Sequence, residues 1–136
     1  MKATALVLLC FLAISLAAVV EKKPADGAKA VETLKKREKG VCYAYLFTNK
    51  DGFNNKEYRA WLKKSLDACK TKNTIEHAEI DQNDAKFAAL VNTLKVNENT
   101  DKFPTVFYMC EGSGDWVHGP ASEKQFNSRF NAAAKC

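Results

Sequence analysis

The sequence has no two cysteines close enough together to form a CxxC motif, because its five cysteines stand at positions 10, 42, 69, 110 and 136. This spacing excludes the common dithiol redox motif and the usual zinc-binding patterns. The chain also has no Asn-x-Ser/Thr site, so N-glycosylation is not expected. It ends in "NAAAKC", which is not a KDEL-type retention signal, and it contains no internal repeat.

Histidine is scarce as well, with only His77 and His118 in the chain. No Cys/His/Asp spacing around them matches a metal site, so we expect neither a metal nor another cofactor. A nucleophile–base pair of Ser113 and His118 is conceivable, but Ser113 stands in the turn-like stretch "GSGD". The sequence therefore predicts no catalytic residue.

The longest apolar run lies at the N-terminus, from about Ala5 to Val20, and follows the positive charge of Lys2. Ser15 and Ala17 fit the small-x-small pattern of a cleavage site. We therefore predict a secretory signal peptide over residues 1–17 and a secreted protein. The alternative is an uncleaved membrane anchor extending to about residue 20, at the short limit for a membrane span.

The formal net charge of the chain is +5. Removing Lys2 with the signal leaves 20 basic and 16 acidic residues, a difference of +4. The excess is concentrated in "KKP" and "LKKREKG" and is typical of a solvated helix face. We expect no nucleic-acid partner, and contact with a membrane only if the N-terminal segment is retained.

Four cysteines remain after the signal: Cys42, Cys69, Cys110 and Cys136. An even number in a small secreted domain indicates two disulfides. Four cysteines allow three pairings, and their spacing alone does not choose among them.

Hydrophobic periodicity predicts the order of elements after a linker at residues 18–27. A short surface helix ends near Gly40, and the apolar run Val41–Phe47 has the pattern of a strand buried on both faces. The expected order is a helix followed by β-α-β-α-β-β-α. Its later elements are a helix over 57–70, a strand over 75–80, a helix over 83–96, strands over 104–110 and around 116–117, and a helix over 122–136.

This order, with Pro104 opening the third strand in "KFPTVFYM", resembles the thioredoxin fold over residues 28–136. The resemblance implies an α/β domain with a four-stranded mixed sheet flanked by helices and preceded by an N-terminal helix. It also implies a cis-proline at Pro104, with Phe103 and Thr105 beside it.

Thioredoxin-like proteins carry a CxxC motif at the start of the first domain helix, where the helix terminus stabilises a thiolate. Here "FNNK" stands at that position, and Asn54 with Glu57 has the spacing of a helix cap instead. The resemblance then implies a surface that binds extended polypeptide through backbone hydrogen bonds. That surface consists of Phe53, Asn54, Asn55, Lys56, Phe103, Pro104 and Thr105.

The resemblance also places all four cysteines at the pole of the fold opposite the vacant redox site. The first and third strands are antiparallel neighbours in this fold, which favours Cys42–Cys110. The first and third domain helices share a face, which favours Cys69–Cys136. The rival pairing, Cys42–Cys69 with Cys110–Cys136, stays open.

The sequence thus predicts a redox-inactive secreted protein that binds a polypeptide or assembles with another protein. One alternative is a thiol–disulfide oxidoreductase that uses cysteines outside a CxxC motif. The other is a disulfide-stapled structural subunit of a membrane or extracellular complex. The partner, the biological process and the oligomeric state are not specified by the sequence.

Overall fold

A computed structural model describes residues 18–49, 55–96, 104–119, 122–134 and 136. The described strands are β1 (Val19–Glu21), β2 (Val41–Thr48), β3 (Thr74–Asp81), β4 (Thr105–Cys110) and β5 (Ser113–His118). The described helices are α2 (Gly27–Lys35), α3 (Asn55–Ala68), the 3-10 turn η1 (Ala85–Phe87), α4 (Ala88–Thr93) and α5 (Glu123–Ala134). The predicted order of a helix followed by β-α-β-α-β-β-α is confirmed.

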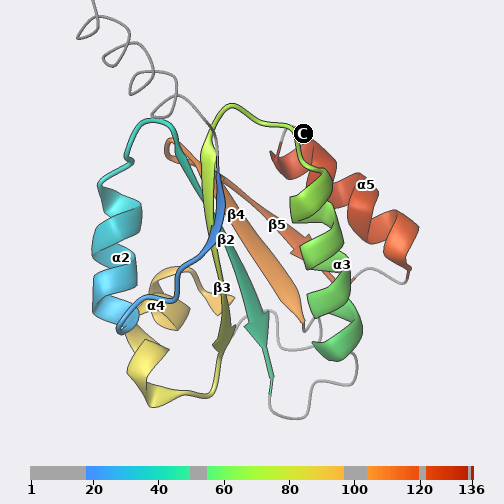
Figure 1. The fold of residues 1–136 in the computed structure, drawn as a ribbon. Coiled ribbons are helices and arrows are strands. Elements are labelled where there is room, and N and C mark those ends of the chain that lie inside the picture. The colour runs from blue at the N-terminus through green and yellow to red at the C-terminus, as the bar shows by residue number, and fades with distance from the viewer. Residues whose placement is uncertain (1–17, 50–54, 97–103, 120–121, 135) are drawn as a thin grey trace, which may run out of the picture.

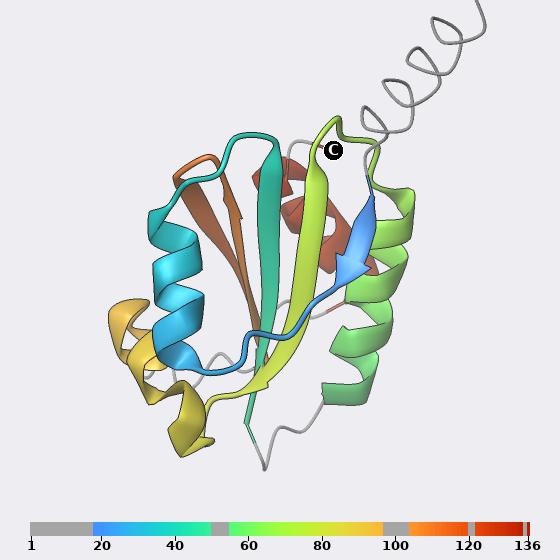
Figure 2. The same cartoon turned by 60° about the vertical axis from the view of Figure 1, so that its left-hand side comes forward.

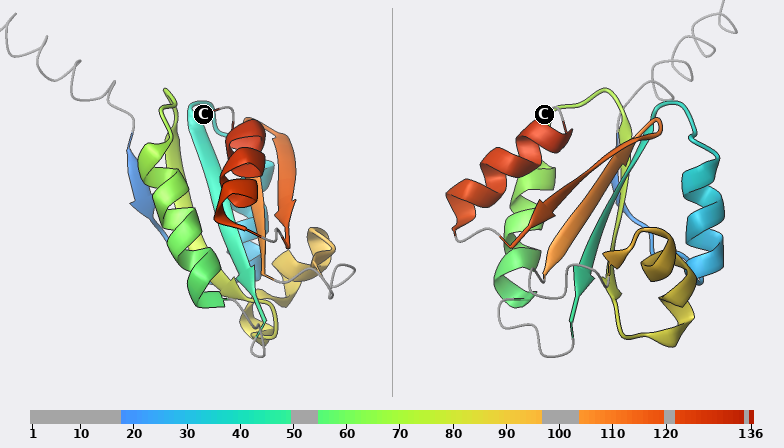
Figure 3. Two further views of the ribbon diagram at one scale, coloured as in Figure 1. Left: turned by 90° about the vertical axis from the view of Figure 1, so that its right-hand side faces the viewer. Right: turned by 180° about the vertical axis from the view of Figure 1, so that it is seen from behind.

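The five described strands form one sheet in the order β1-β3-β2-β4-β5. β3 is parallel to both β1 and β2, whereas β4 is antiparallel to β2 and β5. Helices α2 and α4 cover one face of the sheet, and α3 and α5 cover the other (Figures 1 and 2). In the left view of Figure 3, α3 and α5 stand in front of the sheet. The mixed α/β class is therefore as predicted.

The first strand corrects the predicted strand count of four. We expected residues 18–27 to be a linker, yet Val19–Glu21 pairs in parallel with Ile75–His77 at the sheet edge. The amide of Ile75 donates to the carbonyl of Ala18 at 2.8 Å, and that of Lys22 donates to the carbonyl of His77 at 2.9 Å. A three-residue strand is too short to produce a clear alternation in the sequence, so its partner on β3 determines it.

β2 lies in the middle of the sheet and is buried from Cys42 to Thr48. Its side chains alternate between two core layers, because successive residues of a strand point to opposite faces. Tyr43, Tyr45 and Phe47 belong to the layer under α2 and α4, whereas Cys42, Ala44 and Leu46 belong to the layer under α3 and α5. The prediction that this strand is buried on both faces is confirmed.

Helix α2 begins at a close contact with α4. The Asp26 carboxylate accepts a hydrogen bond from the amide of Lys29 at 2.8 Å and caps the helix. A Cβ added to Gly27 would lie 2.9 Å from the backbone nitrogen of Leu90. Only glycine therefore permits this close approach of the two backbones.

Candidate functional site

The end of β2, the start of α3 and the start of β4 meet at one pole of the sheet. Thr105 lies opposite Phe47 in the β2–β4 register, and Phe47 stands two residues before Asn49 in the chain. The Asn55 side chain donates from Nδ2 to the carbonyl of Asn49 at 2.9 Å, which ties the first turn of α3 to the exit of β2. The structure thus brings Asn55, Lys56, Pro104 and Thr105 to the same end of the fold. We call this end the β2–α3 pole.

The expected binding residues differ in their exposure. Lys56 is exposed and Asn55 is half-buried, whereas Pro104 and Thr105 are buried. The Phe103–Pro104 bond and the residues Phe53, Asn54 and Phe103 lie outside the described part of the chain. Among the described members of the set, Lys56 is therefore the side chain best placed to contact a partner directly.

The Thr105 hydroxyl is committed to contacts within the protein. Its Oγ1 donates to the carbonyl of Val117 at 3.1 Å and lies 2.7 Å from Nδ1 of His118. The His118 ring stacks on Trp116 with centroids 5.3 Å apart, and the Arg129 guanidinium donates to the His118 carbonyl at 3.0 Å. Thr105 therefore fixes the entry of β4 against β5, and His118 joins the pole as a residue that the sequence did not assign to it.

Two asparagines complete the described part of this pole. Nδ2 of Asn83 donates to Oδ1 of Asn49 at 3.0 Å, so the exits of β2 and β3 are joined. Sequence reasoning missed both residues, because only the parallel pairing of Thr48 with Asp81 brings the two exits together. Within the described residues, Oδ1 of Asn55 is a buried acceptor without a hydrogen-bond partner.

A groove runs from Lys56 along α3 to the sheet edge, and its volume is about 640 Å³. Its walls come from α3, β1 and β3, and its apolar lining includes Leu46, Leu62, Leu66 and the 43% exposed Val19. We call it the α3 groove. Neither Pro104 nor Thr105 lines it. The groove therefore extends the candidate surface away from the predicted cis-proline position and along the helix.

Charges of both signs stand on the rim of the α3 groove. Arg59 donates from Nε to Oε2 of Glu79 at 2.6 Å, and its Nη2 pairs with the other carboxylate oxygen at 2.5 Å. This hydrogen-bonded pair raises the pKa of the Arg59 guanidinium, mainly through the bond to Glu79. The bidentate pair holds α3 against β3, whereas Lys56 forms no ion pair with any described residue.

The two disulfides lie at the opposite pole. Cys42 is bonded to Cys110, its direct partner in the β2–β4 register, and Cys69 is bonded to Cys136. The favoured pairing is confirmed, and the rival pairing is wrong. Cys42 and Phe47 stand five positions apart on β2, which corresponds to roughly 17 Å at about 3.3 Å per residue. The bridges are therefore remote from the β2–α3 pole.

Other predicted chemistry can be located in the structure. Ser113 begins β5 and His118 ends it, so the two residues stand at opposite ends of the strand and cannot form a nucleophile–base pair. No group of three or more metal-binding side chains occurs in the described residues. No described helix has the length and apolar character needed to cross a membrane.

Comparison with solved structures decides the fold. Thioredoxin O2 from Arabidopsis thaliana, in its oxidised state, matches with a TM-score of 0.56 over 85% of this chain and 94% of its own. The chain has a thioredoxin-like fold. A mutant thioredoxin from Halobacterium salinarum matches with a TM-score of 0.51 over 88% of this chain and 91% of its own. Identities of 13% and 10% mean that these matches concern the fold.

No model of a known protein family and no curated protein sequence matches this chain. Asn55 and Lys56, the described part of "FNNK", begin α3 at the junction where the resemblance places a cysteine pair. No cysteine occurs in the sequence between Cys42 and Cys69.

Proposed function

We propose that this protein is a secreted, redox-inactive thioredoxin-fold module that binds an extended polypeptide, or a protein partner, at the β2–α3 pole. The observation that carries the proposal is the separation of two features. The pole retains the junction of β2, α3 and β4 without a cysteine, whereas both disulfides occupy the other end of the sheet. A surface with this shape and without a thiol is suited to binding.

The groups available at the pole fit a polypeptide ligand. Lys56 offers an exposed cation that can bind a carbonyl or carboxylate group of the ligand. The α3 groove adds an apolar lining next to Lys56, into which alternate side chains of an extended segment can project. We include Phe53, Asn54, Phe103, Pro104 and Thr105 in the proposed surface, as the resemblance implies.

Secretion is part of the proposal, and β1 supports it. Val19 and Val20 pair with β3, so the apolar run left for a membrane is Ala5–Ala17, or 13 residues. A membrane-spanning helix needs about 20 residues, whereas a run of this length is typical of a signal peptide. Two disulfides fit the same oxidising compartment. Mass spectrometry of the exported protein should find Ala18 as its first residue, and an intact N-terminus would instead favour the anchored alternative.

The binding proposal is tested with a library of extended peptides and fluorescence polarisation. Replacing Phe53 and Phe103 by Ala, or Lys56 by Ala, should weaken the selected peptides by about tenfold, the equivalent of roughly 1.4 kcal/mol. Lys70→Ala is the matched control, because Lys70 is exposed just beyond Cys69 at the opposite pole. Equal affinities in all variants would place the site elsewhere.

Thiol–disulfide exchange is the enzymatic alternative, and the Cys69–Cys136 bridge is its candidate because Cys136 is exposed. An insulin-reduction assay combined with thiol titration distinguishes the two functions. We expect no turnover and no titratable thiol in the native mature protein. Turnover that disappears in a Cys69→Ala/Cys136→Ala variant would establish the oxidoreductase instead.

A further inference from the structure

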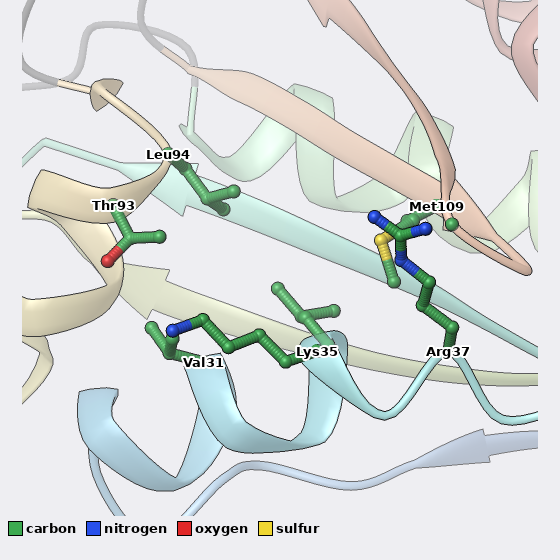
Figure 4. A pocket seen from close by; sticks show the side chains of 8 residues that line it. Val31, Lys35, Arg37, Thr93, Leu94 and Met109 are labelled. Carbon is green, nitrogen blue, oxygen red and sulfur yellow. The ribbon is translucent and has the colours of Figure 1, made fainter.

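A second hollow lies on the other side of the sheet, between α2, α4 and the turn that joins β4 to β5. Its volume is about 610 Å³, within the range of small-molecule sites. Figure 4 shows its side chains converging from three elements: Val31 and Lys35 from α2, Thr93 and Leu94 from the end of α4, and Met109 from β4. We call it the α2 hollow.

The floor of the α2 hollow is apolar and continuous with the core. Leu34 and Met109 are buried members of the core layer under α2 and α4, and Val31 and Leu94 pack against that layer while remaining half-exposed. Together these four side chains offer an apolar surface that no described element covers. Such a surface favours an apolar ligand body.

Two cations stand on its rim. Lys35 and Arg37 are both exposed, and the described residues provide an ion-pair partner for neither of them. In Figure 4 the Lys35 chain extends toward Val31, whereas the Arg37 guanidinium lies beside Met109. The hollow therefore combines an apolar floor with positive charge at its two ends.

The backbone holds Arg37 in this position at a conformational cost. Arg37 has φ 47° and Gly112, across from it, has φ 89°, both in the left-handed region. A Cβ added to Gly112 would lie 2.8 Å from Cδ of Arg37, so glycine leaves the space that the arginine chain occupies. Glu111, in the same turn, accepts a hydrogen bond from the amide of Gly40 at 3.1 Å. The Glu111 carboxylate is therefore bonded to a backbone group.

We propose that the α2 hollow binds a free medium-chain fatty acid. The carboxylate lies on Arg37, whose planar guanidinium matches the two oxygens of a carboxylate. The alkyl chain lies on Val31, Leu34, Leu94 and Met109. The site is distinct from the β2–α3 pole and does not depend on the function proposed for that pole.

The experiment uses the mature protein and decanoate, with binding measured by two-dimensional NMR. Saturable shifts should appear in the amides around Val31, Leu94 and Met109. Decanol, which lacks the charge, and acetate, which lacks the chain, should each bind at least about tenfold more weakly. A charge-assisted hydrogen bond and a buried alkyl chain each contribute more free energy than a tenfold change in affinity requires. Equal affinity for decanol, or the absence of saturable shifts with decanoate, would overturn the proposal.

Three variants locate the carboxylate. Arg37→Gln should weaken decanoate binding about tenfold or more, whereas Lys39→Gln removes an exposed cation that does not line the hollow and should leave the affinity unchanged. Equal losses in these two variants would indicate general attraction to surface charge and overturn the site. Gly112→Ala keeps every charge but displaces Arg37, so it should resemble Arg37→Gln. Thermal unfolding of each variant confirms that the fold is intact.

Discussion

The Thr105 hydroxyl lies 2.7 Å from Nδ1 of His118, and the two residues face each other across the β4–β5 ladder. The Thr105 hydroxyl also donates to the Val117 carbonyl at 3.1 Å, so Thr105 contacts two successive residues of β5. The pair fixes both strands beside Pro104. It thereby supports the β2–α3 pole without offering its own hydroxyl to a ligand.

Thr105→Val should destabilise the protein by about 1–3 kcal/mol, because it leaves the Val117 carbonyl and His118 Nδ1 without their buried partner. Urea unfolding measures the change in free energy. Thr93→Val is the matched control, since Thr93 is exposed at the end of α4 and should change stability by less than about 0.5 kcal/mol. An unchanged midpoint for Thr105→Val would mean that the hydroxyl contributes nothing at this site.

Gly27→Ala should destabilise the protein by roughly 1–3 kcal/mol, although alanine is the better helix former. The added Cβ would lie 2.9 Å from the backbone nitrogen of Leu90 and 3.0 Å from backbone atoms of Phe87, so α2 must move off α4. The reverse change at the next position, Ala28→Gly, alters an exposed residue and should cost about 1 kcal/mol through propensity alone. A Gly27→Ala variant more stable than the parent would show that the two helices part easily.

Removing either disulfide with a pair of alanines should cost up to about 4 kcal/mol. The sequence separations of 68 for Cys42–Cys110 and 67 for Cys69–Cys136 are nearly equal, so the chain-entropy contribution should be nearly equal as well. Guanidinium unfolding of both double variants provides the comparison. A much larger loss for Cys42→Ala/Cys110→Ala would be assigned to packing around Cys42, which is fully buried.

Stability should fall as the pH rises above about 10, the ordinary pKa of tyrosine. Burial raises the pKa of Tyr45 strongly, with Tyr43 and Glu76 adding to the effect, and burial also raises the pKa of Tyr108. The folded state thus keeps protons that the unfolded state releases. The stabilisation is complete below the unfolded pKa and is lost as the pH approaches the folded value, by at most about 1.4 kcal/mol per pH unit for each tyrosine.

Tyr45→Phe removes the contribution of Tyr45 to this loss of stability. The unfolding free energy of the variant should therefore decline less steeply with pH than that of the parent protein. Tyr43→Phe serves as the comparison, because its pKa is raised less strongly and its effect should be smaller. Unfolding in urea at a series of alkaline pH values measures both slopes. Parallel declines in the parent and in Tyr45→Phe would contradict the assignment to Tyr45.

Most of the fold could be predicted from the sequence because its main elements have clear local patterns. The apolar run Val41–Phe47 specifies a strand buried on both faces, and the helical spacing of Tyr58, Leu62 and Leu66 gives α3 one buried face. β1 could not be predicted in this way. Val19 and Val20 continue the apolar N-terminal run, and only pairing with β3 distinguishes them from that run.

The candidate site could likewise be predicted only in part from the sequence. The position of "FNNK" at a strand–helix junction follows from the sequence and the resemblance. The contact of Thr105 with His118 and the link between Asn49 and Asn83 depend on strand register, which joins residues that are 13 and 34 positions apart. The α2 hollow likewise needs three elements that are distant in the chain.

The sequence by itself determined the class of the domain, the absence of a CxxC pair and the number of cysteines available for disulfides, because these depend on residue types and local periodicity. Tertiary structure alone decided which cysteines pair, since Cys42 reaches Cys110 only through the antiparallel register of β2 and β4. It also decided that Pro104 and Thr105 are buried while Lys56 is exposed, because burial depends on what packs over a residue. The local sequence specified which residue types are present, and the sheet specified which of those residues lie close together.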